Sequence, residues 1–376
     1  MWSCLVIYLS DIISVGNARL ASFSKRKKHT VAGVLFSCYI LKYMKLYDVN
    51  GYADQFEMID KGNTFIFEVG ARGTGKTYGA MLYILSSGKK FLYLRRTKTE
   101  ADLVKSDITN PFKVINMDLG TDVKAGRGQY VFPFIKDGEI IGYGAALSTF
   151  YNVRGVDFSD VDIIIYDEFI PENAARPIKN EFEALMNVIE TVNRNRELKG
   201  RKPVKLVCMA NSNKLDNPIF LGLELVNKVA KMAEKGNEVY MDPSRELTVY
   251  MLMHSPISEK KAQTALYKLT AGNDFQRMAL QNQFDMYTDN IRPSKLKEYR
   301  PVVKIGELYI YKHKSRKEYY CTCTCTGTFT KRFTTADIDV ERFVNHYIYL
   351  FDAHIHSKVW FEDPVSVFLF EHFFDS

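Results

Sequence analysis

The chain has few of the features that mark membrane proteins, small secreted domains and repeat proteins. It has only six cysteines in 376 residues, and three of them crowd into residues 321–325 instead of forming a spaced disulfide framework. Its apolar runs, residues 5–9 and 31–41, are interrupted and shorter than the ~20 residues that a membrane span needs. We find no internal repeat and no low-complexity tract. The sequence therefore predicts a globular protein of a reducing compartment such as the cytoplasm, with no membrane partner.

A strong excess of charge is also missing from most of the chain. The net charge is +7, but residues 1–43 carry six basic residues against one acid and so hold +5 of it. The other 333 residues carry only +2. Local basic patches would have to bind any nucleic-acid partner, because the overall charge is too small to attract it.

Residues 1–43 differ from the rest of the chain. They lack a steady hydrophobic period and contain a basic cluster at residues 25–29, whereas Met44 opens a more ordinary stretch. Two interpretations stay open at this point. Either translation starts at Met44, or residues 1–43 form a genuine N-terminal extension.

The remaining composition is that of an ordinary globular protein, with 46% apolar and 25% charged residues. From residue 63 to 215, apolar runs of strand length alternate with helical patterns, which predicts an α/β domain with a mainly parallel sheet. Strands are expected at residues 64–69, 90–94, 145–150, 163–166 and 205–210. Helices are expected at residues 77–85 and 179–193.

We divide the chain into four regions on these patterns. They are an N-terminal extension (1–43), the α/β domain (44–215), a helical lid or linker (216–300) and a smaller α+β domain (301–376). In the last region, residues 302–312 and 318–325 predict a β-hairpin, and residues 337–350 predict a helix.

A glycine-rich stretch between the first predicted strand and helix matches the phosphate-loop pattern G-x4-G-K-[ST]. Its residues are Gly70, Ala71, Arg72, Gly73, Thr74, Gly75, Lys76 and Thr77. Glycines let backbone amides wrap phosphates, and the positive end of the following helix faces them. Lys76 can reach the β- and γ-phosphates of ATP, and the Thr77 hydroxyl can bind Mg²⁺. The sequence therefore predicts a nucleotide-binding loop for ATP and Mg²⁺.

Two adjacent carboxylates, Asp167 and Glu168, follow the apolar run at residues 163–166. In a phosphate-loop ATPase, an aspartate at this position holds Mg²⁺. The neighbouring glutamate can act as a general base on the attacking water. The pair therefore favours hydrolysis of ATP over transfer of phosphate to a small molecule.

Two further polar positions are candidates for contact with the nucleotide. Asn211 follows the predicted strand at 205–210, and ligands of parallel sheets lie at the carboxyl ends of the strands. Asn211 is therefore a candidate sensor of the γ-phosphate. Arg194, at the end of the helix predicted over 179–193, is a candidate for stabilising transition-state charge in a neighbouring subunit.

Five strings of the sequence, in this order and spacing, resemble the DNA encapsidation ATPases of small phi29-like tailed phages. The resemblance runs from about residue 44 to 215 and is weaker beyond. The chain length counted from Met44 also suits that family. The strings are GARGTGK, LYLRRTK, IIIYDEFI, ETVNRNRE and CMANSN.

The resemblance implies a phosphate-loop NTPase fold of the additional-strand, catalytic-glutamate type. It also implies a homomeric ring, a pentamer, that hydrolyses ATP at its subunit interfaces. Such a ring moves double-stranded DNA through the portal protein into the procapsid, so we expect the protein in the host cytoplasm and transiently at the portal vertex. In the relatives a structural RNA bridges the ATPase and the portal, which makes an RNA partner an expectation too.

Individual residues match the family's functional positions. Lys76, Thr77, Asp167 and Glu168 match its nucleotide and catalytic positions, and Arg194 matches the arginine that acts on the ATP of a neighbour. Arg95 and Arg196 are expected at lid or inter-subunit contacts. The basic residues expected to contact DNA phosphates are Lys98, Lys124 and Arg127.

The wider terminase class carries an RNase H-like nuclease after its ATPase. We therefore expect residues 301–376 to resemble such a nuclease without its activity, because residues 302–312 offer only Glu307 as an acidic ligand. The acids and histidines farther on have a spacing that fits no metal site. They are Asp352, His354, His356, Glu362 and Asp363.

Three other classes of protein share part of this pattern. A helicase or recombinase would carry a second set of motifs, which we do not find. A small-molecule kinase would need an acceptor site and usually lacks the glutamate beside the Mg²⁺-binding aspartate. A nucleic-acid-binding scaffold without activity would not need an intact Lys76, Asp167 and Glu168.

Overall fold

The computed structural model describes residues 45–153, 155–171, 178–211, 215, 217–273, 290–292 and 295–374. The N-terminal extension at 1–43 and the alternative start at Met44 lie outside these residues. No helix in the described ranges is both long enough and apolar enough to cross a membrane.

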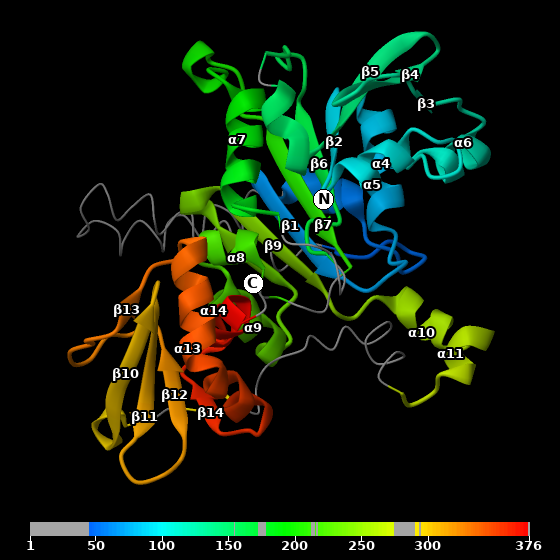
Figure 1. Ribbon diagram of the computed structural model, residues 1–376. Helices are drawn as coiled ribbons and strands as arrows, with labels where there is room; N and C mark the ends of the chain where they lie inside the picture. The colour runs from blue at the N-terminus through cyan, green and yellow to red at the C-terminus, as the bar shows by residue number, and fades with distance from the viewer. Residues whose placement is uncertain are drawn as a thin grey trace, which may run out of the picture.

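A nine-stranded sheet forms the centre of the larger part of the molecule (Figure 1). Its strand order is β3-β4-β5-β2-β6-β7-β1-β9-β8, and the six strands from β5 to β9 run parallel. The predicted α/β class with a mainly parallel sheet is therefore confirmed. The strands are β1 (Phe65–Gly70), β2 (Phe91–Arg95), β3 (Lys124–Ala125), β4 (Val131–Lys136), β5 (Glu139–Ala146), β6 (Ile163–Asp167), β7 (Lys205–Ala210), β8 (Val239–Asp242) and β9 (Leu247–Leu252).

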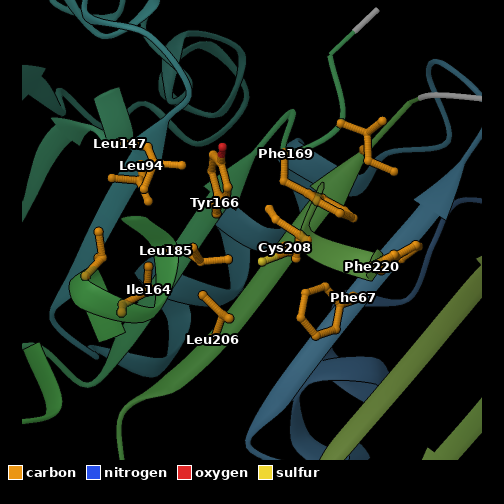
Figure 2. Packing of buried hydrophobic residues seen from close by; sticks show 14 of the residues in the cluster. Phe67, Leu94, Leu147, Ile164, Tyr166, Phe169, Leu185, Leu206, Cys208 and Phe220 are labelled. Atoms are coloured by element: carbon orange, nitrogen blue, oxygen red, sulfur yellow. The ribbon is translucent and has the colours of Figure 1, made fainter. Parts of the chain in front are cut away.

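Helices cover both faces of this sheet because the central strands are apolar on both sides. On one face lie α3 (Gln55–Lys61), α4 (Lys76–Ser87), α5 (Lys98–Val104) and α6 (Lys113–Leu119). On the other lie α7 (Glu181–Asn193), α8 (Pro218–Gly222) and α9 (Val226–Lys235). Figure 2 shows strand residues Phe67, Ile164 and Leu206 in one cluster with Leu185 of α7 and Phe220 of α8.

Two sequence-based assignments are wrong in this part of the chain. The sheet extends beyond residue 215, because β8 and β9 lie within the 216–300 region that we expected to be a helical lid or linker. β9 is buried along its whole length and pairs with β1, so it belongs to the core of the sheet. The strand expected at 145–150 ends at Ala146, and a 3₁₀ helix, η1 (Leu147–Val153), follows it.

The C-terminal part is a five-stranded sheet in the order β13-β10-β11-β12-β14, with two helices on one side. Residues 302–312 do not form one strand, because the chain turns at Gly306, whose φ is +52°, and pairs with itself. The relation to an RNase H-like nuclease stays a prediction. The elements are β10 (Tyr299–Ile305), β11 (Leu308–His313), β12 (Tyr319–Thr322), β13 (Arg332–Phe333), α13 (Asp337–Ile355), β14 (Val359–Phe361) and α14 (Pro364–Phe374).

The two parts contact each other through α9 and α14 (Figure 1). Val365 of α14 packs against the core cluster of the larger sheet. Asn227 of α9 donates to Asp363, just before α14, at 2.8 Å. The remaining short elements are α10 (Pro256–Ala262) and α11 (Ala265–Leu269), with 3₁₀ turns η2 (Glu197–Lys199), η3 (Pro243–Arg245) and η4 (Leu296–Glu298).

A buried ion pair fixes the start of α7 to the end of β2. Arg96 and Glu181 are both 2% exposed, and two hydrogen bonds of 2.7 and 2.9 Å join the guanidinium to the carboxylate. The hydroxyl of Tyr166 also donates to Glu181, at 3.3 Å. The pair therefore sets the position of α7 over the sheet.

We expect Arg96→Met to destabilise the fold by about 3–5 kcal/mol, because Glu181 would stay buried without its cation. Urea-induced unfolding measures this loss. Lys179→Met is the matched control: Lys179 pairs with Asp337 at the surface, and its removal should cost less than ~0.5 kcal/mol. Equal losses in the two variants would contradict a structural role for the buried pair.

Candidate nucleotide site

The phosphate loop joins the end of β1 to the start of α4. Gly73 and Gly75 have φ angles of +68° and +87°, which glycine adopts without the strain that other residues would meet. The loop is braced by the chain before β1, because the amide of Ala53 donates to the carbonyl of Thr74 at 2.8 Å. The backbone therefore has the shape that the sequence pattern predicted.

Lys76 lies at the first position of α4 and is 5% exposed. Its ammonium group donates to the carbonyls of Gly70 and Ala71 at 3.0 and 2.9 Å. Burial lowers the pKa of Lys76 to about 8, and the charges of Glu68 and Asp167 partly oppose that shift. A polyphosphate entering the loop would favour the charged lysine and draw it away from these carbonyls.

The Thr77 hydroxyl donates to the carboxylate of Asp167 at 3.1 Å. Thr77 is on α4 after β1, and Asp167 ends β6, with β7 between the two strands. Tyr93 of β2 donates to the same carboxylate at 2.7 Å. Burial raises the pKa of Asp167, while Arg95 and the Tyr93 hydrogen bond oppose the rise. A hydroxyl and a carboxylate in contact are oxygen ligands of the kind that Mg²⁺ takes, so the residues fit this ion.

Glu168 follows Asp167 in a left-handed conformation, with φ of +57°. Its side chain is 44% exposed and forms an ion pair with Arg95, the last residue of β2. A second nitrogen of Arg95 lies 3.6 Å from Asp167. In this structure the Arg95 guanidinium therefore contacts both carboxylates of its own chain, and its expected role at a lid or inter-subunit contact stays a prediction.

Sequence reasoning missed a buried carboxylate beneath the loop. Glu68 of β1 is fully buried, and Gln55 of α3 donates to it at 2.6 Å. Burial raises its pKa from an ordinary 4.5 to about 7, although the Gln55 hydrogen bond and the charge of Lys76 lower it. The one signal in the sequence was an acid inside an otherwise apolar strand.

Arg194 lies near the amino-terminal ends of the parallel strands, whereas the phosphate loop lies at their carboxyl-terminal ends. Its guanidinium donates to the carbonyl of Val156 at 2.8 Å and lies 3.7 Å from Asp157, both before the start of β6. The five residues of β6 span roughly 16 Å between that edge and Asp167. An arginine side chain cannot cross this distance, so Arg194 cannot reach the loop of its own chain.

Arg196 is 5% exposed and donates to Asp162 and to the carbonyl of Ser159, at 3.1 and 3.3 Å. The inter-subunit role expected for Arg196 is therefore not supported, since its guanidinium is buried inside its own chain. Asn211 directly follows β7, between the strands that carry the loop and the acidic pair, and is half-buried. This placement keeps Asn211 as a candidate contact to the nucleotide.

The three basic residues expected to contact DNA lie at the surface, near β3 and α5 (Figure 1). Lys98 and Lys124 pair with Asp102 and Asp122, at 2.6 and 2.8 Å. Arg127 is exposed in the loop after β3. Local acids thus partly neutralise two of these three cations.

In the C-terminal part, the acids and histidines do not converge. Within the described ranges, no three His, Cys, Asp or Glu side chains are placed to hold one metal ion. Asp363 instead accepts from the amide of Ser366 at the start of α14, at 2.9 Å. His354 lies 3.4 Å from Glu371.

Comparison with known proteins gives a match to the family of podovirus DNA encapsidation proteins (Gp16) over residues 47–305, more than half of the chain. This chain belongs to that family. It is 30% identical to the DNA packaging protein of Bacillus phage phi29 over 235 residues, 61% of this chain and 64% of that protein. The DNA packaging protein of Bacillus phage B103 is 28% identical over 223 residues, 58% of this chain and 63% of that protein.

A solved structure of the bacteriophage phi29 viral genome packaging motor assembly has a similar fold, with a TM-score of 0.60 and 23% identity. The likeness covers 88% of this chain and all of that one. The sequence matches to the two DNA packaging proteins span less than two thirds of the length of each. The fold and the family of the encapsidation protein are thus established.

The raised pKa of Glu68 predicts a pH dependence of stability. Its folded pKa of about 7 exceeds its ordinary 4.5, so the folded state binds the extra proton between these values and loses stability as the pH rises from about 4.5 to 7. In the wild type this decrease in the free energy of unfolding is on the order of 3 kcal/mol, and we expect it to be absent from the Glu68→Gln variant. Urea unfolding of both proteins at pH 5 and pH 8, without nucleotide, measures it. Equal pH dependence of the two proteins would contradict an ionised, buried Glu68.

Proposed function

We propose that this encapsidation protein is an ATP-hydrolysing motor that moves double-stranded DNA into a viral procapsid. The observation that carries the proposal is the contact of Thr77 with Asp167, beside the buried Lys76. It unites the phosphate loop with the acidic pair at one edge of the sheet, which is what hydrolysis of a nucleoside triphosphate requires.

Each residue of the site has a definite task in this proposal. The loop amides and Lys76 bind the phosphates of ATP. Thr77 and Asp167 hold Mg²⁺, which neutralises charge on the phosphate oxygens when it is bound. Glu168 accepts a proton from the attacking water. Because Glu168 pairs with Arg95, this ion pair must open before the carboxylate can act as the base.

The position of Arg194 supports a ring in which each site is built from two copies. Its side chain is 46% exposed at the edge opposite the phosphate loop, so only the nucleotide of another copy is within its reach. A cation added from a neighbour stabilises the charge that develops on the transferred phosphoryl group. In a closed homomeric ring, which we take to be a pentamer, every site receives an arginine from the neighbouring copy.

The partners proposed for the motor follow from the family. The relatives from phages phi29 and B103 are named DNA packaging proteins, which supports double-stranded DNA as the substrate of this chain. The portal protein and a structural RNA are further proposed partners, and the site of action is the portal vertex of a procapsid in the host cytoplasm. Lys98, Lys124 and Arg127 are the proposed DNA contacts. We assign ATP hydrolysis to the part up to β9, and propose that residues 301–376 are a nuclease-like domain without nuclease activity.

The deciding experiment measures ATP hydrolysis by the full chain with and without duplex DNA and procapsids. We expect hydrolysis that DNA and procapsids stimulate. Formation of ADP that needs a small-molecule acceptor and releases no inorganic phosphate would indicate a kinase. A protein that leaves ATP intact under every condition would remove the motor proposal.

Glu168→Gln should bind ATP with an affinity close to wild type yet hydrolyse it at least ~100-fold more slowly, because the amide cannot accept the proton. Binding of a fluorescent ATP analogue and release of phosphate measure the two effects separately. Glu139→Gln, an exposed change at the start of β5, is the control and should leave both unchanged. Hydrolysis at the wild-type rate would refute the assignment of the base.

Arg194→Ala should abolish ATP hydrolysis in rings that contain only this variant. Mixing it with Glu168→Gln should restore part of the activity, because a ring then contains sites with an intact Glu168 and an intact Arg194 from the neighbour. Phosphate release from a series of mixing ratios measures the recovery. Failure of every mixture of the two variants, while separate mixtures of each variant with wild-type subunits stay active, would rule out action between copies.

A further inference from the structure

A lysine outside the phosphate-loop motif also lies against the loop. The ammonium group of Lys261, on α10, donates to the carbonyl of Arg72 at 2.5 Å. Its nitrogen lies over the bend of the loop, where a β-carbon on Gly73 would clash with it. The α10 helix follows the core strand β9 after three residues, so a structured element places the lysine there.

The contacts around α10 hold it in this position. Ser255, just before the helix, is buried and donates to the carbonyl of Gly51 at 2.8 Å. Lys260 donates to the carbonyl of Asn50 at 3.1 Å. The segment that includes Gly51 also braces the loop through Ala53, which makes loop, segment and α10 one packed unit.

Lys261 has a cationic group whose charge is not balanced nearby. Among the residues that the structure describes, no carboxylate lies within ion-pair distance of it. Burial lowers its pKa, and its charge contributes to the lowered pKa of Lys76. Two lysines therefore repel each other across one loop, and an anion bound between them would relieve that repulsion.

We propose that Lys261 is a second phosphate-binding lysine, which contacts the terminal phosphate of a bound nucleoside triphosphate. This inference rests on the proposed function and adds a residue that the motif does not contain. The first amides of α4 bind the inner phosphates and Lys76 reaches the β- and γ-phosphates, so Lys261 adds a second cation at the bend of the loop, beside the terminal phosphate. Lys261 thereby distinguishes a triphosphate from a diphosphate.

The same contact links the state of the nucleotide to the chain beyond the sheet. When the terminal phosphate is bound, Lys261 donates to it instead of to the Arg72 carbonyl. When that phosphate leaves after hydrolysis, the lysine returns to the carbonyl. Only three residues separate α10 from β9. The change of hydrogen-bond partner at Lys261 therefore occurs close to the point where the chain leaves the ATPase sheet.

The test compares the binding of two nucleotides, ATPγS and ADP, to the full chain, each with Mg²⁺. Lys261→Gln should weaken ATPγS binding about tenfold, equivalent to ~1.4 kcal/mol, and leave ADP binding within about twofold of wild type. Lys261→Arg keeps the charge and should retain most of the preference for ATPγS. Lys268→Gln, an exposed change on the next helix, α11, is the control, and it should leave both affinities unchanged.

Three results would overturn the inference, and they differ from one another. Wild-type affinities in Lys261→Gln would show that the lysine does not contact the nucleotide. An equal loss for ATPγS and ADP, with a lower melting temperature, would show that it only supports the loop. Absence of ATPγS binding by the wild-type chain itself would remove the proposed function, and with it the inference.

Discussion

The contact between the Thr77 hydroxyl and the Asp167 carboxylate is the constraint on which the site depends. It exists because β1, β7 and β6 run parallel and end at the same edge of the sheet. A helix start and a strand end, ninety residues apart in sequence, therefore meet at one point. The apolar clusters on the two faces hold these strands in register, so the chemistry depends on packing far from the loop.

The protein side chains assigned to the nucleotide are already bonded within their own chain. Lys76 and Lys261 donate to loop carbonyls, Thr77 donates to Asp167, and Glu168 pairs with Arg95. Binding of a nucleotide thus exchanges hydrogen bonds instead of adding them, and the net free energy gained per contact is small. Under the proposed function, part of the energy of phosphate binding would therefore go into rearrangement of the protein.

Local patterns in the sequence predicted the strand, loop and helix around residues 70–77 and the strand that ends at Asp167, because these motifs are short and each has one strong structural context. They did not predict the strands beyond residue 215, since the pairing of β9 with β1 joins residues about 180 positions apart. Nor could they predict that Arg95 and Arg196 pair with acids of their own chain. An arginine in a motif has the same appearance in sequence whether it binds a neighbour or, as here, acids of its own chain.

The parallel pairing of β9 with β1 also determines how the fold would carry load. Six residue pairs join the two strands, and β9 points toward the edge where the phosphate loop lies. A pull directed along β9 from its carboxyl end would load all six pairs together in shear. A force perpendicular to the strand would instead break the six pairs one after another. β9, the strand beside β1 and its phosphate loop, is therefore held most firmly against a force along its own axis.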